Sequence, residues 1–334
     1  MSVQRRDWLG GAGATVLGGC LGLVGVGARA AVQWKLATGY KPETFHTQNA
    51  ELFAQDVGKA SGGELAIAVH SNNSLVKLPE IFGAVQSGKA EAGEVLMAGI
   101  VKDVPLAGAD SVPFVLSTYK DARRLWQYQA PLIETALAAK GLVPLYAVAW
   151  PPQGLFSVKP VRTKSDFQGL KMRTYNATTV RIAELLGATP VDVATADIPK
   201  ALASGQIEAM ITSSATGAES QVWTHAKFYY ELNAWIPKNM VFASKKAMDA
   251  LSPAARKGLL DSAKVAEDRG WTMSEAALRN AVGDLKSHGM AVERLSLDLG
   301  REIGRLGERF SREWVRTVGN DATRLFIPFY TQTS

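Results

Sequence analysis

Strand and helix patterns alternate along this chain in two successive series. Each strand pattern is a short apolar stretch, and each helix pattern repeats apolar residues every three or four positions. Strands that alternate with helices form mostly parallel sheets with helices on their faces. In the first series, strands are expected at 34–37, 65–69, 92–98 and 142–150, and helices at 44–60 and 78–86. In the second series, strands are expected at 170–173, 189–193 and 207–212, and helices at 178–186 and 197–203.

The alternation predicts an α/β protein with two lobes. Residues 252–288 contain no proline after Pro253 and repeat apolar positions along their length, which indicates one long helix. About 35 residues in helical conformation extend roughly 50 Å, which is longer than one lobe needs. We therefore expect this helix to span both lobes. Lobe I is assigned to 31–150 plus about 239–278, and lobe II to 151–238 plus about 279–334.

Residues 1–30 have the composition of an export signal. Arg5 and Arg6 precede an uncharged stretch that ends in small residues, with cleavage expected after Ala30. The uncharged stretch is rich in glycine, so it is too weakly apolar to be a good membrane span. Leu17–Cys20 resembles a lipoprotein acylation site, which leaves lipidation of Cys20 as the alternative. In either case the chain is expected in the periplasm.

The charge and cysteine content of the exported chain exclude several classes of protein. Removal of residues 1–30 takes away three arginines and one aspartate, so the formal net charge falls from +6 to +4 and no cysteine remains. About 300 residues can bury enough surface to fold without disulfides. A mild positive balance without basic blocks gives no indication of nucleic-acid binding. It is compatible with attraction of small anions.

Arg173 is the residue that points most directly to function. It ends a predicted strand and is followed by Tyr175, Asn176 and Thr178 at the start of a predicted helix. A guanidinium offers two parallel hydrogen bonds to a carboxylate, and Asn and Thr add further donors. This arrangement predicts a site that holds an organic acid without reacting with it.

Motifs that would indicate an enzyme are incomplete. Gly83–Ala90 is one residue short of a phosphate-binding loop, and Ala90 cannot bind magnesium. Ser74–Lys77 fits one motif of the penicillin-recognising enzymes, but its companion motifs are missing. The four histidines lack the spacing of metal ligands. We expect no cofactor, no metal and no catalytic residue.

The order of these segments resembles one known family. The strand ending Gly169–Arg173, the Gly187–Val191 strand, the Ala201–Ala209 segment and the long helix resemble the DctP-like, C4-dicarboxylate-binding solute receptors of TRAP transporters. Asp110–Val115 also resembles the segment after the family's third strand. The resemblance implies a two-lobed periplasmic-binding-protein fold that closes on its ligand. It also implies a membrane permease as partner, and we expect a monomer.

The resemblance also assigns roles to particular residues. Arg173 matches the arginine that clamps the ligand carboxylate, and Asn176 matches a polar residue of the same crevice. Gln153 stands where some relatives have a second arginine. The other candidate ligand-binding residues are Thr212, Ser213, Trp235, Trp150, Tyr40 and Leu96. Asn176 can equally be a helix cap, and both tryptophans can equally belong to the core.

These residue types predict a ligand with one carboxylate and an apolar or aromatic body. Gln153, Thr212 and Trp235 replace Arg, Asn and His types of the family, which removes charge and adds apolar area. A 2-hydroxy or 2-keto acid fits this description, with Gln153, Asn176 or Thr212 binding its second polar group. Lys77 could supply a second cation and favour a dicarboxylate instead. Two other functions stay open, an exported enzyme on a similar scaffold and a ligand sensor for a membrane receptor.

Overall fold

The computed structural model describes residues 31–331 of the 334-residue chain. The predicted export signal, with its cleavage site after Ala30 and the possible lipidation at Cys20, lies outside the described residues and stays a prediction. Within residues 31–331, no helix combines the length and the apolar composition that crossing a membrane requires.

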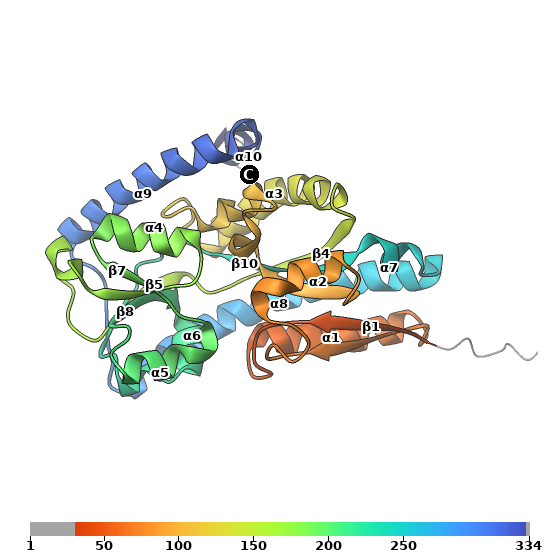
Figure 1. Cartoon of the computed structure of the whole chain (residues 1–334), viewed down its shortest axis with the longest axis horizontal. Helices are drawn as coiled ribbons and strands as arrows, with labels where there is room; N and C mark the ends of the chain where they lie inside the picture. Colours follow the sequence, from red (N-terminus) through yellow and green to blue (C-terminus); the bar gives the residue numbers. More distant parts are fainter. Residues whose placement is uncertain (1–30, 332–334) are drawn as a thin grey trace, which may run out of the picture. The chain divides into compact units, whose positions relative to one another are not determined.

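The described residues contain two separate β-sheets (Figure 1). The first has the strand order β2-β1-β3-β10-β4, and the second the order β11-β9-β5-β8-β6-β7. The strands of the first sheet are β1 (Val32–Ala37), β2 (Leu65–His70), β3 (Ala92–Leu96), β4 (Leu142–Ala149) and β10 (Lys238–Ser244). Those of the second are β5 (Gln153–Ser157), β6 (Lys171–Thr174), β7 (Thr189–Asp192), β8 (Ala209–Ser213), β9 (Phe228–Tyr230) and β11 (Ala291–Glu293). This confirms the predicted α/β fold with two lobes.

Both sheets are mostly parallel, as predicted, and each contains one antiparallel strand among the described residues. β10 runs antiparallel to both of its neighbours, β3 and β4, and β5 runs antiparallel to both β8 and β9. Both strands lie directly after a crossing of the chain from one sheet to the other. A strand that enters from the opposite lobe arrives from the opposite direction, so it fits between its neighbours only as an antiparallel strand. Both strands were absent from the sequence prediction.

Helices cover both sheets, and the five predicted helices lie within a few residues of their predicted ranges, while α3, α6, α7, α9 and α10 were not predicted. The α-helices of the first series are α1 (Phe45–Ala60), α2 (Ile81–Gln86) and α3 (Tyr119–Ala138). Those of the second are α4 (Ala177–Leu186), α5 (Ile198–Ala203) and α6 (Ser214–Glu219), followed later by α7 (Lys245–Asp249), α8 (Pro253–Ser287), α9 (Leu297–Val318) and α10 (Asn320–Thr331). Short 3-10 turns lie at Leu78–Glu80, Met97–Ile100, Pro105–Ser111, Lys164–Phe167, Thr195–Asp197 and Val222–Thr224.

The long helix α8 spans both lobes, as predicted (Figure 1). Its first half packs with Leu259 and Ala263 in the core of the first sheet, and Leu285 near its end belongs to a core cluster of the second. Glycines permit the close approach that this packing needs. A Cβ atom at Gly258 would lie 2.9 Å from the backbone of Ala60, and one at Gly270 would lie 2.3 Å from the side chain of Val148. The helix therefore packs directly on α1 and β4.

The end of the chain departs from the predicted lobe boundaries. Helix α10 packs against α3, and its Leu325 and Phe329 belong to the same core cluster as Trp126 and Ile133. The apolar face of α10 therefore packs against elements of lobe I. The structure does not support placing residues 320–331 in lobe II, and the other boundaries stay a prediction.

A buried ion pair lies where the chain returns to the first sheet. The Lys238 ammonium lies 3.0 Å from an Asp110 carboxylate oxygen, and both side chains are 0 % exposed. The same oxygen accepts a hydrogen bond from the Lys238 backbone N–H, and the Ser111 hydroxyl donates to the other oxygen. Burial raises the pKa of Asp110 and lowers that of Lys238, and each charge partly offsets the shift of the other.

Backbone hydrogen bonds join the neighbouring chain segments at this crossing. The N–H groups of Gln153 and Trp150 donate to the carbonyls of Trp235 and Pro237, and the Phe114 N–H donates to the Ala234 carbonyl. Three segments that are distant in sequence are thus joined at one place. Movement of one lobe against the other has to be accommodated here.

Removal of one member of the ion pair should destabilise the fold strongly. Lys238→Met leaves the Asp110 carboxylate buried without a cation, and a loss of about 3 to 5 kcal/mol in the free energy of unfolding is expected from urea titration. The surface pair of Lys245 and Asp249 is the matched control, and Lys245→Met should cost less than about 1 kcal/mol. Similar losses for the two variants would contradict a special role for the buried pair.

Candidate functional site

Arg173 lies on β6, between β7 and β8 of the second sheet. Its side chain is 2 % exposed, and its Nε donates a hydrogen bond of 2.9 Å to the Val193 carbonyl. One terminal nitrogen donates to the Thr195 hydroxyl at 3.1 Å, and the guanidinium carbon lies 4.7 Å from the ring centre of Tyr175. These contacts hold the guanidinium in one orientation. None of them neutralises its charge.

No carboxylate among the residues that the structure describes lies within ion-pair distance of Arg173. Burial lowers the pKa of Arg173 to about 10, although the charge of Asp192 acts on it and raises its pKa, so the side chain is still cationic at neutral pH. Lys238, the other buried cation, is paired with Asp110. An unpaired buried charge is costly, and a protein retains one where an anion is to be bound. The site is therefore complementary to one carboxylate.

One tyrosine from each lobe lies close enough to Arg173 for its charge to affect the pKa of the tyrosine. Burial raises the pKa of Tyr175 to about 12, the charge of Arg173 opposes this, and the Trp235 indole donates a hydrogen bond to the Tyr175 hydroxyl. Burial also raises the pKa of Tyr40, and the charge of Arg173 again opposes the rise. Tyr40 follows β1 of the first sheet, so a residue of lobe I lies within electrostatic range of the arginine on lobe II.

A buried network of polar side chains joins β3 and β10 of the first sheet to the loop after β1. The Glu94 carboxylate accepts hydrogen bonds from the Thr38 hydroxyl at 2.5 Å and from the Asn239 amide at 3.0 Å. The Asn239 oxygen in turn accepts from the Tyr40 hydroxyl at 3.2 Å and from the Trp150 indole at 2.9 Å. The network fixes the orientation of the two aromatic rings, whose centres lie 5.2 Å apart.

His46 completes this network and contributes a free acceptor. Its Nδ1 lies 3.3 Å from a Glu94 oxygen, and its ring centre lies 4.3 Å from that of Trp150. Burial lowers the pKa of His46, although Glu94 opposes this, so the ring is neutral at pH 7. Burial raises the pKa of Glu94, but hydrogen bonds from His46, Thr38 and Asn239 outweigh this and lower it overall. Nδ1–H therefore donates to Glu94, and Nε2 is an acceptor with no partner among residues 31–331.

The other predicted site residues lie near strand ends and helix starts. Gln153 begins β5 and pairs in register with Ser213, while its side chain donates to the Pro151 carbonyl at 2.8 Å. Thr212 and Ser213 end β8, and the Ser213 hydroxyl accepts the Thr216 N–H as the cap of α6. Asn176 caps α4 through a 2.9 Å bond from the Thr179 N–H. Leu96 ends β3, opposite Asn239.

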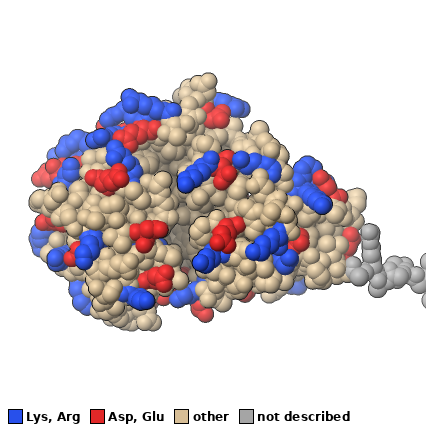
Figure 2. Space-filling model, in the orientation of Figure 1, with Lys and Arg blue, Asp and Glu red and all other residues tan. Residues whose placement is uncertain are grey.

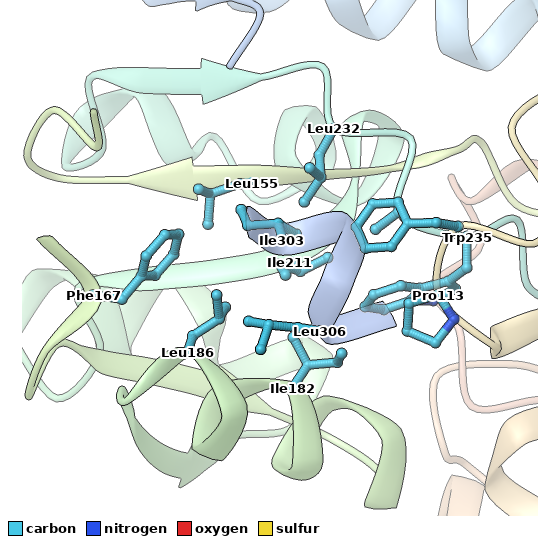
Figure 3. Close-up of a pocket in the computed structure, with 12 residues that line it drawn as sticks. Pro113, Leu155, Phe167, Ile182, Leu186, Ile211, Leu232, Trp235, Ile303 and Leu306 are labelled. Atoms are coloured by element: carbon cyan, nitrogen blue, oxygen red, sulfur yellow. The ribbon is translucent and has the colours of Figure 1, made fainter. Parts of the chain in front are cut away.

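Trp235 lies in the core, which is one of the two positions that the sequence analysis left open for it. It is 1 % exposed and packs in the core cluster of the second sheet, with Leu155, Phe167 and Ile211. With these residues it lines an apolar cavity of about 10 Å³ between β5, β8, α4 and α9 (Figure 3). That volume is at the lower limit for one water molecule, and the lining offers it no polar partner. Trp235 therefore contacts the candidate site through Tyr175 and through the backbone N–H of Gln153.

Glu94, His46, Asn239, Thr38 and Tyr175 were not predicted as site residues. One signal was available, because Glu94 is an acid inside an otherwise apolar strand, Ala92–Leu96. Such a residue needs buried hydrogen-bond partners. Tyr175 stands two residues after Arg173 and could have been included with it. The roles of His46 and Asn239 depend on the fold, since they reach Glu94 from α1 and β10.

Comparisons with known proteins agree with this arrangement. Residues 36–298 match the model of the family described as bacterial extracellular solute-binding protein, family 7. A solute-binding protein of Albidiferax ferrireducens is 27 % identical over 177 residues, which is 52 % of this chain and 52 % of that protein. The protein YiiZ of Salmonella typhimurium is 22 % identical over 234 residues, or 65 % of this chain and 70 % of its own length. The match to the Albidiferax protein thus spans about half of its length.

Solved structures are similar over nearly the whole of this chain. DctP6 of Bordetella pertussis, an extracytoplasmic solute receptor binding pyroglutamic acid, is 37 % identical with a TM-score of 0.88, over 90 % of this chain and 100 % of DctP6. A marine metagenome TRAP solute-binding protein specific for pyroglutamate is 33 % identical with a TM-score of 0.88, over 91 % of this chain and 100 % of that protein. The family model and these structures together show that the chain belongs to the DctP family of solute-binding proteins, the periplasmic solute receptors of TRAP transporters.

Proposed function

We propose that this protein captures pyroglutamate, or a closely related cyclic monocarboxylate, in the periplasm and delivers it to the membrane permease of a TRAP transporter. The observation that carries the proposal is the buried guanidinium of Arg173, which has no carboxylate within ion-pair distance among the described residues. The two solved relatives that are most informative, at 37 % and 33 % identity, both bind pyroglutamate. Export through residues 1–30, cleavage after Ala30 and function as a monomer belong to the same proposal.

The charges around the site favour a ligand with one carboxylate. Arg173 can neutralise one, and Gln153, which is neutral, stands where a second cation would be needed. Lys238 is already paired with Asp110. Lys77 is exposed at the start of a 3-10 turn. A second carboxylate buried without a cation would cost several kcal/mol.

The polar network of lobe I suits the lactam ring of pyroglutamate. A lactam has one N–H donor beside its carboxylate and a compact apolar ring. The His46 Nε2 atom is a buried acceptor without a partner among the described residues, and Tyr40 and Trp150 supply aromatic surface next to it. We propose that His46 accepts the ligand N–H, which would satisfy both groups. Glu94 would be the positioning residue that keeps the proton on Nδ1.

Arg173 should be essential for binding, and lysine should not replace it. Arg173→Ala removes the cation that meets a buried carboxylate, for which a loss of about 2 to 5 kcal/mol in binding free energy is expected. Arg173→Lys keeps a charge but cannot form two parallel hydrogen bonds or the bond to the Val193 carbonyl. Isothermal titration calorimetry with L-pyroglutamate measures both, and near-normal binding by the lysine variant would remove the clamp role.

The ligand class can be tested by thermal shift. L-Pyroglutamate should raise the melting temperature more than succinate or malate at equal concentration, because the second carboxylate of these dicarboxylates would be buried without a cation. Open-chain 2-hydroxy and 2-keto acids with apolar bodies belong in the same panel, as the alternative ligand class. If four-carbon dicarboxylates stabilise the protein best, the monocarboxylate assignment is wrong.

The role of His46 predicts a dependence on the ligand N–H. The lactone analogue of pyroglutamate replaces N–H by oxygen, so the wild-type protein should bind it about tenfold or more weakly than the lactam. In His46→Phe, which keeps a ring of similar size without the acceptor, this difference should shrink to about twofold. Calorimetry of both ligands with both proteins gives the four binding affinities of a thermodynamic cycle. An unchanged lactam preference in His46→Phe would exclude His46 as the acceptor.

A further inference from the structure

A hydrogen bond joins the two lobes through residues that lie outside the segments crossing between the sheets. The Thr44 hydroxyl donates to a Glu219 carboxylate oxygen at 3.0 Å. Thr44 directly precedes α1, which packs on β2 of the first sheet, and Glu219 is the last residue of α6, which follows β8 of the second. In Figure 2, acidic and basic side chains lie on both sides of the hollow between the two halves of the surface.

Thr44 is placed at the start of α1 without acting as the usual cap. It is the N-cap residue of this 16-residue helix, yet its side chain accepts no hydrogen bond from the first turn, and that turn contains no acidic residue. The Thr44 hydroxyl is therefore free to donate to Glu219 of the other lobe.

We propose that the Thr44–Glu219 hydrogen bond is a latch that holds the two lobes closed over the ligand. Glu219 is then a positioning residue for binding, because it acts by stabilising the closed arrangement and not by touching the ligand. The proposal goes beyond the capture of an organic acid, although its binding measurements use the ligand proposed above. The crossing segments permit movement between the lobes, and the latch sets how often the ligand-free protein is closed.

The electrostatics of Glu219 add a pH dependence to the latch. Glu219 is exposed as a whole residue, but partial burial of its carboxyl group raises its pKa; the Thr44 bond and the charge of Lys41 lower it, and the charge of Glu43 raises it. Helix α8 also packs on α6, and none of its charged residues is among the causes of this shift. A pKa that is raised in the closed form and ordinary in the open form means that closing takes up protons. Closure is therefore favoured as pH falls toward the ordinary value for a carboxyl, and this contribution is lost as pH rises through the raised pKa.

Substitutions on the two sides of the latch should have different effects. Thr44→Val removes the donor and leaves the carboxyl facing a methyl group, so the apparent affinity should fall about fivefold or more. Thr44→Ser restores the hydroxyl and should restore the affinity. Glu219→Gln keeps an oxygen that Thr44 can donate to and removes the cost of enclosing a charge, so its affinity should equal or exceed that of the wild type. Glu43→Gln is the neighbouring control, and removal of its like charge should not weaken binding.

The experiment measures closure with and without ligand. Dyes on Lys59→Cys in α1 and Lys200→Cys in α5, both exposed positions, report the distance between the lobes by energy transfer in the mature chain, which has no other cysteine. Thr44→Val should lower the closed fraction of the ligand-free protein, and Thr44→Ser should not. Calorimetry with L-pyroglutamate at pH 7.5 and pH 5.5 should show tighter binding at the lower pH in the wild type and no such change in Glu219→Gln.

Two results would overturn the latch. The first is a closed fraction in Thr44→Val equal to that of the wild type, a measurement that needs no ligand and so does not depend on the pyroglutamate proposal. The second is a pH dependence in Glu219→Gln equal to that of the wild type. Melting temperatures of all variants should agree closely, because the Thr44 hydroxyl caps no backbone N–H of α1.

Discussion

The buried pair of Asp110 and Lys238 lies at the point on which both lobes depend. Lys238 is the first residue of β10, which returns from the second sheet into the middle of the first, and Asp110 binds both its ammonium and its backbone N–H. Like β5, which makes the opposite crossing, β10 lies between two strands of its sheet and runs antiparallel to both. Each lobe therefore contains a strand supplied by a crossing, so neither sheet is complete without it.

The two sides of the candidate site differ in how their charges are satisfied. Glu94 in lobe I accepts hydrogen bonds from Thr38, His46 and Asn239 and needs nothing further from a ligand. Arg173 in lobe II is held by a carbonyl and a hydroxyl, which orient it and leave its charge unbalanced. In the proposed binding mode this asymmetry would orient the ligand, with its carboxylate on lobe II and its remaining polar group toward lobe I. Binding energy then depends on both lobes only when they are close together.

Much of the fold could be predicted because its signals are local. The helix at 44–60 was predicted to within one residue, and Gly187, with a φ of 82°, ends α4 as its glycine suggested. Arg173 was placed correctly at a strand end for the same reason. The antiparallel strands β5 and β10 could not be predicted, since their direction depends on a crossing that no local pattern records. The network around Glu94 likewise joins residues 145 positions apart. The role of Trp235 stayed open because a tryptophan has the same appearance in the sequence whether it belongs to a core or to a ligand site.

A solute receptor must release its ligand as well as bind it, and this limits how strongly the lobes can be held together. If closure rested on interactions as strong as that of Asp110 with Lys238, the closed form would persist without ligand and release would be slow. The contact of Thr44 with Glu219 is weaker, because it is a single hydrogen bond whose acceptor lies in a partly exposed residue. The structure thus places its strongest buried charge pair at the crossing, where the lobes stay joined. In the proposed closure the weaker contacts lie where the lobes would separate, so the ligand carboxylate on Arg173 would contribute most of the free-energy difference between the open and closed forms.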